Sequence, residues 1–167
     1  MTHSPADQSD PDAFPPATIE AFLRCCAGEW MSLRSQFTLG AGGEGDDWHR
    51  SERGELVVSY LEASSAGDPG SLQVAPRLDG ALQPATQVVF ASDGGFHSSA
   101  SAQGRWTLWP DGSLELVVSS PTGEVCEKIW FTKPNLRLRS TVESRADGAP
   151  GRASFSSEIR RVSRPAA

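Results

Sequence analysis

From residue 28 onward the chain alternates between apolar and polar positions in short segments, a pattern typical of β-strands that bury one face. Turn-forming residues separate most of the segments, as in Asp93-Gly94-Gly95 and Pro110-Asp111-Gly112. This pattern predicts antiparallel strands joined by short hairpins. The predicted strands are 30–39, 53–62, 86–92, 96–102, 104–109, 113–119, 124–132, 135–144 and 152–162.

A helical period precedes the strands. Thr18 is a suitable N-cap, and Gly28 is a suitable stop. The sequence therefore predicts a short amphipathic helix over 19–27. Its apolar face has the i, i+3, i+4, i+7 spacing, with Ile19, Phe22, Leu23 and Cys26.

One short helix followed by nine or more consecutive strands predicts a mainly β fold, a closed antiparallel meander β-barrel of about 9–10 strands, because closure removes exposed strand edges. The barrel is expected over 18–163. The polar, proline-containing stretch 1–17 is expected to be a disordered N-terminal tail, and 164–167 a C-terminal tail. The stretch 63–85 is interpreted as a long loop with one short strand at most. A barrel of this size is either filled with side chains or holds one small ligand.

Composition narrows the function classes. The formal net charge of −6 argues against nucleic-acid binding, and no apolar run reaches the length of a membrane span. The N-terminus lacks the features of a secretory signal. Three cysteines do not form a disulfide framework, so a cytoplasmic protein is expected. The three histidines are His3, His49 and His97. Their positions do not have the spacing of metal ligands, so no metal is expected.

The strand around "PNLRLRSTVE" has an unusual charged face. Leucines point to one side, whereas Arg137, Arg139 and Thr141 point to the other. From the rise per residue, the two arginines stand about 6.5–7 Å apart, which suits two anionic groups. The same face could equally be solvated, or paired in salt bridges with neighbouring glutamates.

The segment Gly28-Glu29-Trp30 opens the first predicted strand. Its G-x-W pattern resembles the lipocalin and fatty-acid-binding-protein superfamily, in which the tryptophan plugs one end of the barrel beneath an arginine of the last strand. The resemblance implies that Trp30 is a structural plug, with Arg160 or Arg161 over its ring.

Four longer blocks resemble the S/U-type phycobiliprotein lyases, in that family's order: "CAGEWMSLRSQFTL" (26–39), "GELVVSYLE" (54–62), "EKIWFTKPNLRLRSTV" (127–142) and "FSSEIRR" (155–161). This family attaches linear tetrapyrroles (bilins) to cysteines of phycobiliproteins and carries the bilin in a lipocalin-like barrel. The stretch 63–100 departs from the family pattern, because its usual tryptophan-containing strand is missing.

The resemblance implies roles for particular residues, which suit bilin chemistry because a bilin carries two propionates, four ring nitrogens and an apolar skeleton. Each role has a structural alternative: an exposed glutamate, a salt bridge from Glu158 to an arginine of the next strand, or a tryptophan that belongs to the core. Arg34, Arg137 and Arg139 would hold the propionates. Glu127 and Glu158 would act catalytically at the ring nitrogens. Thr141 would supply a polar contact, and Trp130 an aromatic one.

The function implied is that of a bilin lyase. It would bind phycocyanobilin or phycoerythrobilin noncovalently and promote thioether formation with a cysteine of a phycobiliprotein alpha or beta subunit, acting by orientation and electrostatics. A homodimer, or a heterodimer with a related lyase chain, is also expected. The competing interpretations are a noncatalytic carrier of bilin, haem or fatty acid, and an accessory subunit of a hetero-oligomeric lyase.

Overall fold

The computed structural model describes residues 13–38 and 49–163. The predicted tail segments 1–12 and 164–167 lie outside the described residues, as does 39–48. Within the described part, the chain forms one helix and eleven strands: α1 (Ile19–Cys26), β1 (Gly28–Thr38), β2 (His49–Leu61), β3 (Gly70–Leu78), β4 (Ala81–Leu82), β5 (Thr86–Phe90), β6 (Gly95–Ser98), β7 (Gln103–Leu108), β8 (Leu114–Ser120), β9 (Gly123–Lys133), β10 (Leu136–Arg145) and β11 (Arg152–Arg160).

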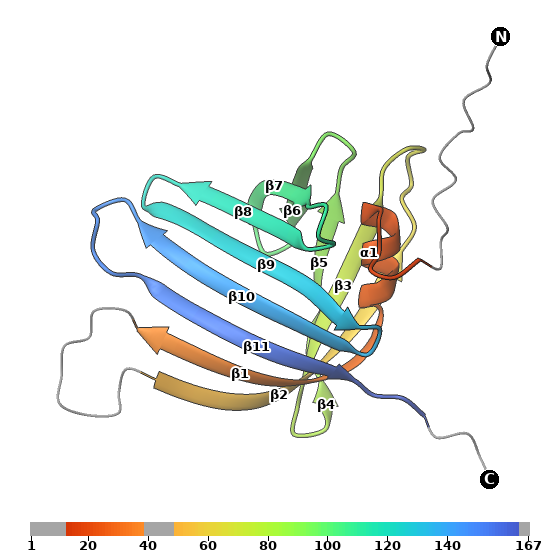
Figure 1. Ribbon diagram of the computed structural model, residues 1–167, viewed down its shortest axis with the longest axis horizontal. Helices are drawn as coiled ribbons and strands as arrows, with labels where there is room; N and C mark the ends of the chain where they lie inside the picture. Colours follow the sequence, from red (N-terminus) through yellow and green to blue (C-terminus); the bar gives the residue numbers. More distant parts are fainter. Residues whose placement is uncertain (1–12, 39–48, 164–167) are drawn as a thin grey trace.

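The strands form a closed antiparallel barrel, which confirms the predicted fold class (Figure 1). Their order is β2-β1-β11-β10-β9-β8-β7-β6-β5-β3-β4, and a further pairing of β2 with β3 closes the ring. The two-residue strand β4 pairs with β3 as a short hairpin. Ten strands therefore make the ring, so the sheet presents no long unpaired edge.

The helix packs against one end of the barrel interior. Thr18 caps it, accepting a hydrogen bond from the Ala21 amide, and the helix ends at Cys26, as its sequence pattern predicts within one residue. Its buried face belongs to a single apolar cluster with inward-facing strand residues. The most buried members of that cluster are Phe22, Leu23, Cys26, Trp30, Phe90 and Leu114.

Trp30 lies in this cluster as a plug, 1% exposed, and its indole Nε1 donates to the Cys26 carbonyl at 2.9 Å. The guanidinium of Arg160 stands over its ring at 4.4 Å. Arg160 is thus the last-strand arginine that the G-x-W resemblance implies. The structure places a second guanidinium, that of Arg137, 4.5 Å from the same ring, which the sequence interpretation did not anticipate.

The stretch 63–85, interpreted as a long loop with one short strand at most, contains the nine-residue β3 and the two-residue β4, so it is more ordered than predicted. Residues Gly70–Leu78 pair with β2 on one side and β5 on the other, and this pairing completes the ring. The segment has inward apolar positions at Leu72 and Val74, but Gly70 and Pro76 interrupt the alternation within the strand. Hydrogen-bonded pairing with a strand on each side outweighs these local breaks.

Pro15 and Pro16, which the sequence placed in the N-terminal tail, pack against the barrel. Pro16 is fully buried, and Pro15 lies against the turn at Gly112, where an added Cβ would come within 2.9 Å of the proline Cβ. Gly112 has a φ of +82°, so it needs glycine for its backbone conformation as well as for space.

Candidate functional site

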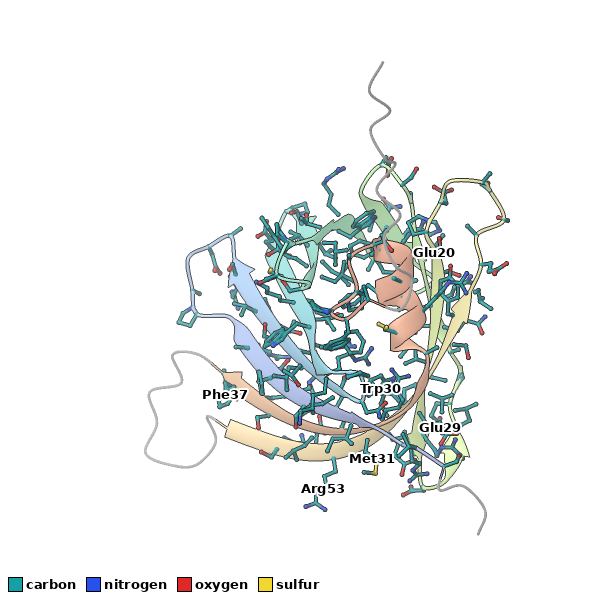
Figure 2. All side chains as sticks on the ribbon, turned by 45° about the vertical axis from the view of Figure 1, so that its right-hand side comes forward. Glu20, Glu29, Trp30, Met31, Phe37 and Arg53 are labelled. Carbon is teal, nitrogen blue, oxygen red and sulfur yellow. The ribbon has the colours of Figure 1, made fainter. Side chains whose placement is uncertain are left out.

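The barrel encloses a cavity of about 380 Å³ on the inner faces of six strands, farther along β1 from the helix than the Trp30 plug. The volume falls in the range of small-molecule sites. Polar or charged side chains line it from all six strands, Glu52 of β2 and Arg77 of β3 among them, whereas Leu56 and Val74 supply apolar contacts. Figure 2 shows Trp30 inside the barrel and Met31 pointing away from it, the alternation that brings every second side chain to the cavity.

Arg139 stands at the centre of the polar wall. Its Nη1 lies 3.6 Å from Glu127 Oε1, and its Nε lies 3.6 Å from Glu158 Oε1. The Thr141 hydroxyl donates to the other oxygen of Glu127 at 3.4 Å. All four residues line the cavity, so the structure brings together one cation, two carboxylates and a hydroxyl that the sequence analysis selected separately.

The strand register explains this grouping. Arg139 of β10 lies opposite Ile129 of β9, next to the pair formed by Thr141 and Glu127. On its other side, β10 pairs with β11, where Arg137 lies opposite Glu158. Antiparallel neighbours on the same face come within reach of long side chains, so three strands build the charged wall without any loop.

Arg137 occupies a different environment from Arg139. It is 1% exposed, its Nε donates to Glu158 Oε2, and it does not line the cavity. The salt bridge between Glu158 and an arginine of the neighbouring strand, left open by the sequence, is therefore present. The arginine face does point into the barrel, but direct propionate binding by Arg137 needs correction, because Glu158 and the Trp30 ring enclose it.

Two buried guanidinium nitrogens have no hydrogen-bond partner among the described residues: Arg137 Nη2 and Arg139 Nε. The distance from Arg139 Nε to Glu158 is that of an ion pair without a hydrogen bond. Buried N–H groups are normally satisfied, so the Arg139 nitrogen lacks a partner that the described residues do not supply.

The electrostatics keep Arg139 charged. Burial alone lowers the pKa of its guanidinium, but the carboxylates of Glu127 and Glu158 raise it by more, so the net pKa is raised. For the Cys26 thiol, which is uncharged when protonated, burial has the larger effect. Burial raises the pKa of this thiol, and the nearby Arg137 lowers the pKa only partly. The wall therefore contains a permanent cation, and the buried thiol beneath it stays protonated at neutral pH.

Arg34 of β1 lines the cavity farther from the plug. Its Nη2 donates to the Ser154 hydroxyl at 3.4 Å, and it has no ion pair with a carboxylate in the described part of the chain. It is more exposed than Arg139, which suits a cation at the entrance of a site.

Trp130 does not reach the cavity, and its predicted role as a pocket wall needs correction. It lies on the outer face of β9, where its ring is 6.3 Å from the ring of Phe155. The alternation of the strand sends Ile129 and Phe131 into the core, and therefore sends Trp130 outward.

The sequence analysis missed the small residues that make room for a ligand. Serines occupy inward positions on β1 and β11 between the charged groups, and they leave the space that larger side chains would fill. The signal was the alternation of "SFSSE", in which Ser154 and Ser156 are two successive small residues on the face that carries Glu158. The serines that line the cavity are Ser32, Ser154 and Ser156.

No group of three or more potential metal ligands occurs among the described residues. No helix in the part of the chain that the structure describes is long and apolar enough to cross a membrane.

This chain is similar to known proteins in sequence and in structure. A family model described as CpeS-like protein matches residues 85–161. The chain is 45% identical over 152 residues to chromophore lyase CpcS/CpeS 1 of Paulinella chromatophora, covering 90% of this chain and 92% of that protein. The chain belongs to the CpcS/CpeS chromophore lyase family. Chromophore lyase CpcS/CpeS 2 of Synechococcus sp. (strain JA-3-3Ab), another member, is 38% identical over 180 aligned residues, with 87% of this chain and 91% of that protein covered.

A solved structure agrees with the fold of the CpcS/CpeS family. The S-type phycobiliprotein lyase CPES from Guillardia theta superposes with a TM-score of 0.68 at 22% identity, over 87% of this chain and 94% of that one. At this identity the match shows a shared barrel architecture.

Proposed function

We propose that this protein is a bilin lyase, which binds a linear tetrapyrrole in its barrel and promotes its thioether attachment to a cysteine of a phycobiliprotein alpha or beta subunit. One observation carries the proposal: in a chain of the chromophore lyase family, Arg139 stands between Glu127 and Glu158 on the wall of a cavity of about 380 Å³. A cation between two carboxylates matches a ligand that carries both anionic side chains and N–H donors.

The cavity offers complementary groups to each part of a bilin. Arg139 and Arg34, which both line the cavity, would bind the two propionates. Glu127 and Glu158 would accept hydrogen bonds from the ring nitrogens, and Thr141 would orient Glu127. The apolar contacts come from Leu56 and Val74.

The reaction is an addition in which no atom is lost. The thiolate of the acceptor cysteine attacks the ethylidene side chain of ring A and forms a carbon–sulfur bond, while the π electrons shift into the ring and a proton is taken up there. The nucleophile comes from the acceptor, so this chain acts by holding the bilin in one orientation and excluding competing additions. The buried, protonated thiol of Cys26 has no part in this step.

The substrate in this proposal is phycocyanobilin or phycoerythrobilin, and the reaction takes place in the cytoplasm. The three cysteines of this chain are free thiols, which suits a reducing compartment such as the cytoplasm. The proposal includes no metal.

Co-expression with a bilin-producing pathway and a phycobiliprotein subunit tests the proposal. The expected result is covalent pigment on the subunit, seen as zinc-induced fluorescence of the denatured band and lost in a subunit variant without the acceptor cysteine. Pigment that stays on this chain without transfer would instead establish a noncatalytic carrier. Transfer that appears only after addition of a related lyase chain would establish an accessory subunit.

For the partner, we favour a second copy of this chain, docked through the outer face of β1, β10 and β11. Apart from Glu29 at the start of β1, those strands carry their charges inside the barrel, and the rest of their outer face holds only apolar residues and serine, in a chain with 22% charged residues. In a two-fold contact a side chain near the axis meets its own copy, so like charges are excluded there. This outer patch consists of Met31, Leu33, Leu138, Ser140, Val142, Ala153, Phe155, Ser157 and Ile159.

A further inference from the structure

In the proposed function, Arg137 makes no direct contact with the bilin. Its side chain is 2% exposed, and it does not reach the cavity that holds Arg139 and Glu158. A ligand in that cavity meets the Glu158 carboxylate first, with the guanidinium of Arg137 behind it. Direct contact between Arg137 and a ligand carboxylate is therefore blocked by a residue that carries the same charge as the ligand group.

Glu158 needs the support that Arg137 provides. Its side chain is 2% exposed, and a carboxylate so far from water is stable only when paired. Arg137 Nε binds one oxygen, Oε2, while the other oxygen, Oε1, faces Arg139 at 3.6 Å. The first contact fixes the side chain, and the second oxygen stays on the cavity side.

Arg137 is itself held in place from behind. Its guanidinium lies 4.5 Å from the ring of the Trp30 plug, and Trp30 is hydrogen-bonded to the end of the helix through Cys26. A chain of contacts thus runs from the closed end of the barrel, through Trp30 and Arg137, to the carboxylate at the cavity.

We propose that Arg137 is a positioning residue: it orients Glu158 toward the ring nitrogens of the bilin and does not bind the propionates. This inference rests on the proposed function and assigns the propionates to Arg34 and Arg139 alone. It separates two arginines that the sequence treats as equivalent.

The methyl esters of a bilin separate direct from indirect arginines, because esterification removes the propionate charges and leaves the ring nitrogens intact. The probes are phycocyanobilin and its dimethyl ester, titrated by absorbance. We expect Arg34→Gln to weaken binding of the free acid about 10- to 100-fold and to change ester binding little. Arg137→Lys should weaken binding of both forms by the same factor.

A purely structural role for Arg137 is distinguished by the bound spectrum and by coupling to Glu158. We expect Arg137→Lys to give the same shift in the bound bilin spectrum as Glu158→Gln, and to add no further loss of affinity in the Glu158→Gln background. The matched control is Arg160→Lys, since Arg160 contacts the same Trp30 ring without touching Glu158. It should lower stability and leave the spectrum unchanged.

The outcomes are distinct. A loss confined to the free acid in Arg137→Lys, a loss additive with that of Glu158→Gln, or the same spectral shift in Arg160→Lys overturns the inference while the proposed function stands. A wild-type chain that binds neither bilin form overturns both. If Arg137→Lys does not fold, a double variant with Arg137→Met and Glu158→Met is compared with the single variant Glu158→Met. Equal affinities of the two variants for both bilin forms support the inference. A further loss of affinity for the free acid in the double variant opposes it.

Discussion

At the scale of single residues, the environment of a side chain decides its role more than its type does. Arg137 and Arg139 are two positions apart on one strand and face the same way, yet one is enclosed and the other lines the cavity. The difference comes from the strand end: Arg137 lies beside the plug at Trp30, whereas Arg139 lies beyond it. Burial likewise turns Cys26 into an unreactive thiol.

Cys26 makes stability depend on pH in the alkaline range. Burial raises the pKa of its thiol above its ordinary value of about 9, so the folded chain keeps a proton that the unfolded chain releases above that pH. The free energy of unfolding should fall as the pH rises from 9. Cys26→Ala should remove up to about 1.4 kcal/mol per pH unit of that slope.

Urea unfolding at pH 8 and at pH 10 measures the slope. Ser113→Ala is the matched control, because Ser113 is equally buried but does not titrate in this range. It should shift stability by the same amount at both pH values. An unchanged slope in Cys26→Ala would contradict the assignment.

At the scale of elements, β3 decides whether the sheet is a barrel. It pairs with β2 and with β5, so the ring opens without it. Its first residue, Gly70, has a φ of +114°, and an added Cβ would lie 2.6 Å from the Leu61 carbonyl oxygen and 2.7 Å from the Tyr60 hydroxyl. The closing strand therefore begins at a position where only glycine fits.

Gly70→Ala should lower the free energy of unfolding by about 2–4 kcal/mol, because it combines backbone strain with a clash against backbone and a packed ring. Thermal and urea denaturation followed by circular dichroism measure the loss. Gly54→Ala on β2 is the control, since an added Cβ there meets nothing within 4 Å, and it should change stability by less than about 0.5 kcal/mol. Equal stability of the two variants would show that the start of β3 tolerates a side chain.

At the scale of the whole molecule, one side of the barrel has its charges inverted relative to an ordinary barrel. Apart from Glu29 at the start of β1, the strands β1, β10 and β11 place arginines and glutamates inside and uncharged side chains outside. Five apolar side chains of the outer patch are more than two-fifths exposed: Met31, Leu33, Val142, Phe155 and Ile159. The interior thereby becomes a binding site, and the exterior a surface suited to pairing.

The outer patch predicts a charge-dependent dimer. Ser157 lies between Leu33 and Leu138 at the centre of the patch, so Ser157→Asp and Ser157→Lys should each weaken self-association at least about tenfold. An equimolar mixture of the two variants should restore the dimer by pairing opposite charges. Sedimentation velocity measures both effects.

Thr107→Asp is the control, because Thr107 is exposed on the outer face of β7, away from the patch. It should leave association unchanged. A wild-type chain that sediments as a monomer at every concentration would contradict the second copy. Self-association that survives both Ser157 variants would place the contact elsewhere.

The sequence predicted the helix and most strands, because these depend on local periods of 3.6 and 2 residues. The period of two placed both arginines on one face, and only the family resemblance implied that this face lines the barrel. The sequence also selected Glu127, Glu158 and Arg139, which the structure gathers at one wall. It did not predict the full length of β3, because Gly70 and Pro76 interrupt the alternation of that strand. It assigned Trp130 to the pocket because an aromatic type alone does not reveal which face of a strand carries it.

The sequence by itself therefore determined the class of fold, the family and the alternation that separates the two faces of each strand. The tertiary structure decided which end of the barrel is closed, and that choice gives the charged side chains different tasks. Arg137, beside the plug, pairs with Glu158 away from water, whereas Arg139 and Arg34 remain open to the cavity. The physical reason is that burial and pairing depend on strand register across the ring, which no local pattern encodes.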